Sequence, residues 1–391
     1  MKELLEKINQ SARKIVNDVC KIRSEERVLI ITNRVLEELS ISDKATAKTT
    51  ILPQVEIIAQ ALYDECENAG AKVSMVTQPA KHSMDSADET VLAALKTEPD
   101  VCFSISHHML GKDANGISHP YVDDEGNSYD HIFDYLLYGK KTMRSAWTPG
   151  ITLDMFERTV AIDYHELQQR CATLCKLYKN VVQVEVKAPA GTDLVIPVEG
   201  RQPLADDGDF SKPGTGGNIP AGEVFISPVV GNGKDKGCSG RIVFDGSMSV
   251  NSGCVAINDP IIVDVTGGFI TNISGGYEAQ KLLETITEAE QEALAMGKDG
   301  RLSQEDSQLY YRNARNIGEL GIGLNPAAKI TGNMLEDEKV FKTCHIAIGE
   351  NYDNDANALI HLDGVIKNPM IDFIYQDASR RRVLDNGVIQ F

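Results

Sequence analysis

The chain has 391 residues, a formal net charge of −18 and 42% hydrophobic residues, so it is too long for one ordinary core and apolar enough to bury two. It contains no run of the ~18 apolar residues that a membrane-spanning helix needs. The acidic charge argues against a nucleic-acid partner, because binding to a phosphate backbone depends on clustered Lys and Arg. We therefore expect a globular protein that binds neither membrane nor nucleic acid.

The first residues and the cysteines bear on the compartment. The N-terminal segment is charged and amphipathic and lacks the apolar core of a signal peptide, so we expect a cytoplasmic location. The eight cysteines are scattered, and none has the Cys-x-x-Cys spacing of zinc ribbons or redox motifs. Reduced thiols are expected in such a protein.

The first half of the chain predicts helices that alternate with short apolar strands. The expected strands cover residues 28–32, 71–76 and 101–106, and the expected helices cover residues 4–22, 52–67 and 87–95. Residues 131–137 and 155–178 continue this pattern. The α/β alternation predicts a parallel sheet covered by helices, an αβα domain.

Two histidines, His107 and His108, directly follow the third predicted strand. Adjacent residues of an extended chain point to opposite sides, so at most one of the two would face a cleft. We interpret both as surface loop residues.

The pattern changes near residue 180, where paired strands and glycine-rich turns begin. The expected strands cover residues 181–187, 193–198, 242–244 and 260–266, and the expected helices cover residues 278–295 and 304–315. We therefore predict two domains, residues 1–180 and residues 181–391. The second is expected to be a β-rich α+β domain.

Metal-binding residue types stand close together near the C-terminus. His345 precedes an apolar run that is typical of a buried strand. His361 and Asp363 are two positions apart, so on a strand both point to the same side. Imidazole nitrogen and carboxylate oxygen together suit zinc, cobalt, manganese or iron(II). The sequence therefore predicts a divalent metal site.

Two acidic residues upstream strengthen this hypothesis. Glu223 and Glu319 lie in apolar or glycine-rich surroundings, where an unpaired carboxylate would be costly to bury. Each needs a positive partner, and a metal ion would supply one.

Taken in order, these segments resemble the metal-dependent aminopeptidases of the aminopeptidase T type, the M29 peptidase family. That family has an Asn-x-Pro-x-x-Glu-Val-Phe-x-x-Pro segment, matched at 218–228, and a Gly-Glu pair, matched at Glu319. It also has a His-x-Ala-x-Gly segment, matched at His345, with a tyrosine seven positions later, and a final His-x-Asp. The resemblance is close over the C-terminal half and general over the N-terminal half.

The resemblance implies a site and an activity. Two divalent ions, zinc, cobalt or manganese, would be bound by Glu223, Glu319, His345, His361 and Asp363. Tyr352 would stabilise the transition state, and Glu338 would act as an outer-shell group or a ligand. The implied protein is a homodimeric, leucyl aminopeptidase-like metallo-aminopeptidase. It would remove the N-terminal residue of short peptides with a metal-activated water.

Two alternatives stay open. The same scaffold resembles iron-dependent dioxygenases that open dihydroxypyridine rings with one iron held by two His and one Asp. In that branch the first glutamate is absent and a His stands where Glu319 is, so the presence of Glu223 and Glu319 favours the hydrolase. The other alternative is a non-catalytic metal-binding homologue.

Overall fold

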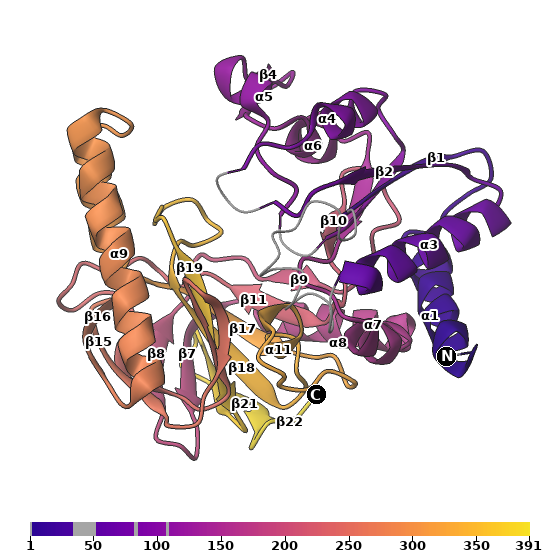
Figure 1. The fold of residues 1–391 in the computed structure, drawn as a ribbon. Helices are drawn as coiled ribbons and strands as arrows, with labels where there is room; N and C mark the ends of the chain where they lie inside the picture. Colours follow the sequence, from indigo (N-terminus) through magenta and orange to yellow (C-terminus); the bar gives the residue numbers. More distant parts are fainter. Residues whose placement is uncertain (1, 34–51, 82–84, 107–108) are drawn as a thin grey trace. The chain divides into compact units, whose positions relative to one another are not determined.

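The computed structural model describes residues 2–33, 52–81, 85–106 and 109–391, so His107 and His108 lie outside the described residues. The chain divides into two compact units, which Figure 1 shows coloured along the sequence. The first unit comprises Met1–Gln168 and Gly208–Ala221, and the second comprises Gln169–Asp207 and Gly222–Phe391. The boundary predicted at residue 180 thus falls inside the second unit.

A five-stranded sheet forms the centre of the first unit. Its strand order is β10-β6-β3-β1-β2 and every neighbouring pair is parallel. The strands are β1 (Arg27–Asn33), β2 (Lys72–Gln78), β3 (Val101–Ile105), β6 (Arg144–Trp147) and β10 (Gly216–Asn218). Every residue of β3 is buried, as expected for a central strand of a parallel sheet. The edge strand β10 comes from the Gly208–Ala221 segment and was not predicted.

Helices connect these strands. They are α1 (Lys2–Lys14), α3 (Leu52–Asn68), α4 (Glu89–Leu95), α5 (Ala114–Ser118), α6 (Ile132–Asp134), α7 (Leu153–Val160) and α8 (Tyr164–Leu177). Two π-helical turns, η1 (Ile15–Val19) and η2 (Tyr135–Gly139), follow α1 and α6. A small antiparallel hairpin consists of β4 (Tyr121–Val122) and β5 (Ser128–Tyr129). The Thr152 side chain caps α7 by accepting a hydrogen bond from the Met155 amide at 3.2 Å.

Two antiparallel sheets form the second unit. The seven-stranded sheet has the order β14-β13-β19-β18-β17-β11-β9, and the eight-stranded sheet has the order β16-β15-β12-β8-β7-β20-β21-β22. The first sheet contains β9 (Leu204–Asp206), β11 (Glu223–Ile226), β13 (Ser247–Val250), β14 (Gly253–Ala256), β17 (Ile317–Gly323), β18 (Thr343–Gly349) and β19 (His361–Lys367). The second contains β7 (Val181–Lys187), β8 (Asp193–Pro197), β12 (Ser239–Phe244), β15 (Ile261–Thr266), β16 (Phe269–Ser274), β20 (Met370–Tyr375), β21 (Arg380–Asp385) and β22 (Val388–Ile389).

The two sheets of the second unit pack against each other through β12 and β19. A Cβ on Gly364 would lie only 2.4 Å from the Phe244 ring, so the glycine leaves the space that this ring fills. Three helices accompany the sheets: α9 (Tyr277–Asp299), α10 (Gln304–Asn313) and α11 (Met334–Asp337). Because neighbouring residues of a strand alternate between faces, Asp363 points away from the Phe244 side of β19.

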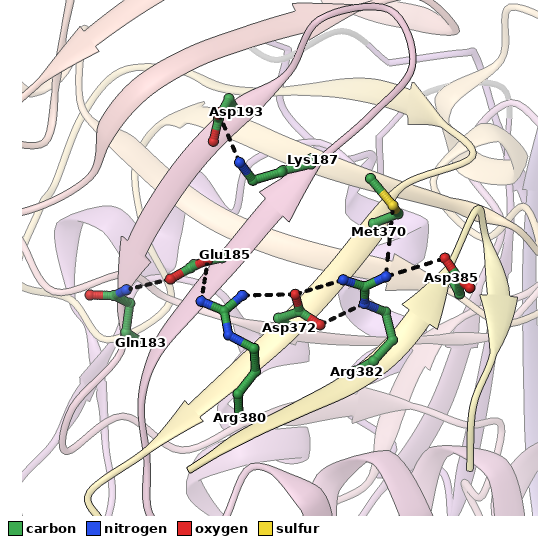
Figure 2. Close-up of polar contacts among 9 residues, drawn as sticks. All are labelled: Gln183, Glu185, Lys187, Asp193, Met370, Asp372, Arg380, Arg382 and Asp385. Carbon is green, nitrogen blue, oxygen red and sulfur yellow. Dashed lines mark hydrogen bonds and ion pairs between the residues drawn. The ribbon is translucent and has the colours of Figure 1, made fainter. Parts of the chain in front are cut away.

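An ionic cluster on the eight-stranded sheet, here called the arginine cluster, comprises Glu185, Asp372, Arg380 and Arg382 (Figure 2). Arg382 donates to Asp372 Oδ1 at 2.6 Å and Oδ2 at 3.0 Å, and Arg380 donates to Asp372 Oδ2 at 2.9 Å. Arg380 also donates to Glu185 at 2.8 Å, so the cluster joins β7, β20 and β21.

The architecture confirms the predicted fold class, a parallel-sheet α/β unit followed by a β-rich α+β unit. In the part of the chain that the structure describes, no helix has the length and apolar character needed to cross a membrane.

Candidate metal centre

The metal centre, as defined here, comprises Glu319, His345, His361 and Asp363 on three adjacent strands. In the antiparallel register Glu319 of β17 pairs with Ala347 of β18, which pairs with Asp363 of β19. Directly paired residues point to the same face of a sheet, so two carboxylates flank one small residue. The methyl side chain of Ala347 leaves the space between them open.

A missing side chain makes room for His345. Gly321 is paired with His345 across the strands, and a Cβ on Gly321 would lie 2.0 Å from Nε2 of that imidazole. The His345 ring therefore lies over the backbone of β17, where it reaches Glu319. Any side chain at position 321 would move the ring.

The four side chains of the centre form a continuous series of close contacts. His345 Nε2 lies 2.9 Å from Glu319 Oε1, and His361 Nε2 lies 3.4 Å from both Glu319 Oε2 and Asp363 Oδ1. Glu319 thus stands between the two histidines. Two overlapping groups have the spacing to hold an ion: Glu319 with His361 and Asp363, and Glu319 with His345 and Glu223.

A hydrogen bond behind the centre orients His361. Its Nδ1 lies 2.9 Å from the Glu350 carbonyl oxygen, so Nδ1–H is assigned as the donor and Nε2 faces the carboxylates. This is the arrangement that metal-binding histidines commonly have. Burial opposes ionisation, but the charge of His361 and its hydrogen bond outweigh burial and lower the pKa of Asp363 to about 2. Asp363 is therefore an anion near neutral pH.

A second group, here called the lysine cluster, adjoins the centre. Lys339, two residues past α11, places Nζ 2.5 Å from Glu223 Oε1, 2.8 Å from Glu338 Oε1 and 3.2 Å from Asp206 Oδ2. The lysine is only 1% exposed. Glu223 links the cluster to the metal centre, since its Oε2 lies 3.4 Å from His345 Nε2.

Burial changes the charge of the lysine cluster. Despite the nearby ammonium group, burial raises the pKa of Asp206 to about 7 and the pKa of Glu338 to about 8. Burial alone would lower the pKa of Lys339, but the charges of Glu223, Glu338 and Asp206 raise it well above its usual range. Lys339 is therefore a permanent cation in this cluster.

Tyr352 lies at the exposed side of the centre. Its ring is 5.3 Å from the His361 ring and 4.9 Å from the Phe225 ring, and the residue is 52% exposed. Desolvation of the hydroxyl, followed by the charges of Glu319 and Asp363, raises its pKa. The phenol stays protonated near neutral pH and can donate a hydrogen bond.

The structure brings most of the predicted site residues together. Glu319 contacts His345 and His361, and His361 contacts Asp363. Glu223 lies beside His345, and Tyr352 lies beside His361. Glu338 contacts Lys339. The sequence analysis missed Asp206 and Lys339, and it assigned the positive partner of Glu223 to a metal ion, whereas Lys339 fills that role.

The donor set fits a divalent cation. Glu223, Glu319 and Asp363 are all buried beside two imidazoles, and Glu223 Oε2 and His345 Nδ1 are buried without a hydrogen-bond partner in the described structure. Buried carboxylates grouped with imidazoles, some of whose polar atoms lack a partner, are suited to bind a metal ion. Metal binding is therefore consistent with the geometry.

Comparisons with known proteins agree on the fold. The family model described as 2,5-dihydroxypyridine 5,6-dioxygenase (NicX) matches residues 152–347. The structure of 2,5-dihydroxypyridine dioxygenase from Pseudomonas putida KT2440 is similar, with a TM-score of 0.66 and 17% identity over 98% of this chain and 96% of that one. AmpT from Thermus thermophilus has a TM-score of 0.61 and 14% identity over 99% of both chains. No curated protein sequence matches the chain.

The family match corrects the predicted activity. The prediction of a hydrolase, a metallo-aminopeptidase acting in proteolysis, is wrong, because the matching family model describes a dioxygenase. The resemblance to aminopeptidase T holds for the fold. The error came from treating both glutamates as evidence for two ions, although the Lys339 ammonium already neutralises Glu223.

Proposed function

This chain belongs to the 2,5-dihydroxypyridine 5,6-dioxygenase family, whose model spans half of it, and we propose that it is a metal-dependent dioxygenase that opens a dihydroxylated pyridine ring. This is the ring-cleaving dioxygenase that the sequence left open as an alternative to the aminopeptidase. Dioxygen is the only co-substrate, since both of its atoms enter the product and no external reductant is needed.

The observation that carries the proposal is the group of Glu319, His361 and Asp363, which lies inside one unit and has the spacing of a metal site. These three residues would hold the ion, and His345 supports Glu319 from the other side. Non-haem iron(II) oxygenases typically bind their ion with two histidines and one carboxylate, whereas this group has one histidine and two carboxylates, with Glu319 in place of a histidine. Imidazole nitrogen and carboxylate oxygen both suit iron(II), so we propose iron(II) as the ion. When bound, this ion would supply the redox chemistry that lets dioxygen react with an aromatic ring.

The side chains around the centre suit a planar, hydroxylated substrate. Phe225 is paired with Gly321 in the sheet and lies beside Tyr352, so the two aromatic rings form one wall next to His361. Aromatic pairs of this kind bind flat rings through their faces and edges. The protonated Tyr352 hydroxyl would donate a hydrogen bond to a hydroxyl oxygen of the substrate and orient the ring.

The test is an oxygen-uptake assay on anaerobically reconstituted protein. Protein loaded with iron(II) is mixed with 2,5-dihydroxypyridine, and dioxygen consumption is followed together with the loss of the aromatic absorbance. We expect one dioxygen consumed per ring opened. Hydroquinone serves as a comparison substrate, because its two hydroxyls have the same para arrangement but its ring has no nitrogen.

Two controls sharpen this assay. Glu319→Gln should show no uptake, and Asp372→Asn, which alters the arginine cluster only, should match the wild type. If the wild-type protein retains bound iron(II) but leaves the pyridine ring intact in air, ring cleavage is not its activity.

A further inference from the structure

Lys339 is a fully buried cation whose partners are all carboxylates. Lysine is almost never buried unless it is paired, and here it contacts Asp206, Glu223 and Glu338 within 3.2 Å. Glu338 is the chain neighbour of Lys339, but Asp206 of β9 and Glu223 of β11 reach the ammonium group from segments far away in the sequence. Such a convergence resembles the way carboxylates surround a metal ion.

The lysine lies beside the second of the two groups with metal-site spacing. That group consists of Glu223, Glu319 and His345, all buried. Glu319 is shared with the other group, so Glu223 is the only carboxylate that belongs to this one alone. Its Oε1 is occupied by Lys339 Nζ, and a dication placed beside Glu223 would be repelled by the ammonium charge.

We propose that Lys339 serves as a built-in substitute for a second metal ion: its ammonium neutralises Glu223, so the chain binds one ion, held by Glu319, His361 and Asp363. The proposal rests on the proposed function only in that the centre binds a metal. Removing the ammonium while keeping the carboxylates should open the Glu223, Glu319 and His345 group to a second ion.

The experiment counts bound metal and needs no catalytic turnover. Each protein is stripped with a chelator, dialysed against excess manganese(II), freed of unbound ion by gel filtration and analysed by plasma mass spectrometry. Wild type is expected to hold one manganese per chain and Lys339→Met two. In the electron paramagnetic resonance spectrum, two neighbouring manganese(II) ions in Lys339→Met should give an exchange-coupled signal that wild type lacks.

Two substitutions separate charge from bulk. Lys339→Arg keeps the positive charge and should hold one ion, and Lys187→Met removes an exposed lysine paired with Asp193 and should also hold one. Circular dichroism establishes that each variant is folded before metal is counted. A folded Lys339→Met that holds a single ion, or a wild type that holds two, overturns the proposal.

Two variants that keep Lys339 test the proposal in the case in which Lys339→Met does not fold. Glu223→Gln should still hold one manganese, because Glu223 belongs to the lysine, whereas Glu319→Gln should hold none. Loss of the ion in Glu223→Gln overturns the proposal. Ring cleavage is not measured, so the metal count stands or fails separately from the proposed dioxygenase activity.

Discussion

The arginine cluster and the metal centre are both built from carboxylates on β-strands, yet their charges are balanced differently. In the arginine cluster, each oxygen of Asp372 accepts a hydrogen bond from a guanidinium group. In the metal centre, Glu319 and Asp363 face imidazoles that are themselves metal-ligand types. Carboxylates matched by arginines hold strands together, whereas carboxylates grouped with histidines are placed to accept an ion.

The largest expected effect comes from removing a carboxylate of the metal centre. Glu319→Gln replaces the carboxylate between His345 and His361 with a neutral amide, so metal affinity should fall by more than the roughly hundredfold typical of outer-shell changes. Isothermal titration with manganese(II) measures this. Asp372→Asn is the matched control in the arginine cluster, and it should bind manganese like wild type. Equal affinity in all three proteins would remove the distinction between the clusters.

Two glycines on opposite faces of the same sheet test whether the space for His345 matters. Gly321→Ala places a methyl against the His345 ring, whereas Gly364→Ala places one against Phe244. Both should lower stability, by roughly 1–3 kcal/mol each, because both sites are packed. Only Gly321→Ala should also weaken metal binding, by roughly tenfold to a hundredfold, because it displaces a group that supports the ligands.

Thermal unfolding and manganese titration on the same samples separate these effects. Unchanged metal affinity in a folded Gly321→Ala would mean that His345 takes no part in the centre. Weakened binding in Gly364→Ala would mean that general loss of packing, and not the position of His345, controls the affinity.

Much of the fold and of the metal centre was predictable from local pattern. The His361–Asp363 spacing implies one strand face, and β19 places both side chains there. Strand periodicity and turn glycines likewise predicted the paired strands β7 and β8. In each case the signal lies within a few residues, so it does not depend on how distant segments meet.

Contacts between distant segments were not predictable in the same way. Lys339 follows three acidic residues, a sequence that reads as a solvated surface, yet it is buried against Asp206 and Glu223 from two other strands. Likewise β10 joins the first sheet only because the chain returns to it after leaving. Neither arrangement has a local pattern, because the partners are far apart in the sequence: Lys339 binds Glu223, and Gly216 of β10 pairs with Ser145 of β6.

Tyr352 tests the exposed side of the metal centre and has a smaller expected effect. If its hydroxyl orients the substrate, Tyr352→Phe should lower kcat by up to about tenfold, since a hydrogen bond between uncharged groups contributes roughly 0.5–1.5 kcal/mol. Manganese affinity should stay at the wild-type value, because the raised pKa keeps the Tyr352 phenol protonated and the proposed ligands are Glu319, His361 and Asp363. Oxygen uptake at saturating 2,5-dihydroxypyridine measures kcat, and an unchanged value would exclude Tyr352 from substrate orientation.

The smallest effect is expected at the arginine cluster, where pH acts on stability and not on metal binding. The hydrogen bond from Arg382, opposed by burial and aided by Arg380, lowers the pKa of Asp372. Because the pKa of Asp372 is lower in the folded than in the unfolded chain, its ion pairs with the two arginines stabilise the folded chain at pH values above the unfolded pKa of about 4. This contribution is lost as the pH falls through the pKa of Asp372 in the folded chain. Asp372→Asn should therefore reduce the free energy of unfolding by roughly 1 kcal/mol at pH 7, because the arginines are half-exposed.

Differential scanning calorimetry of wild type and Asp372→Asn at a series of pH values measures this contribution. The two melting temperatures should differ by roughly 2–4 °C at pH 7 and converge as the solution is acidified, because protonated Asp372 resembles the amide in charge. A constant difference across the series would show that the amide disturbs packing. A difference that tracked manganese concentration would mean that the arginine cluster is coupled to the metal centre, and the contrast between a structural cluster and a ligand cluster would no longer hold.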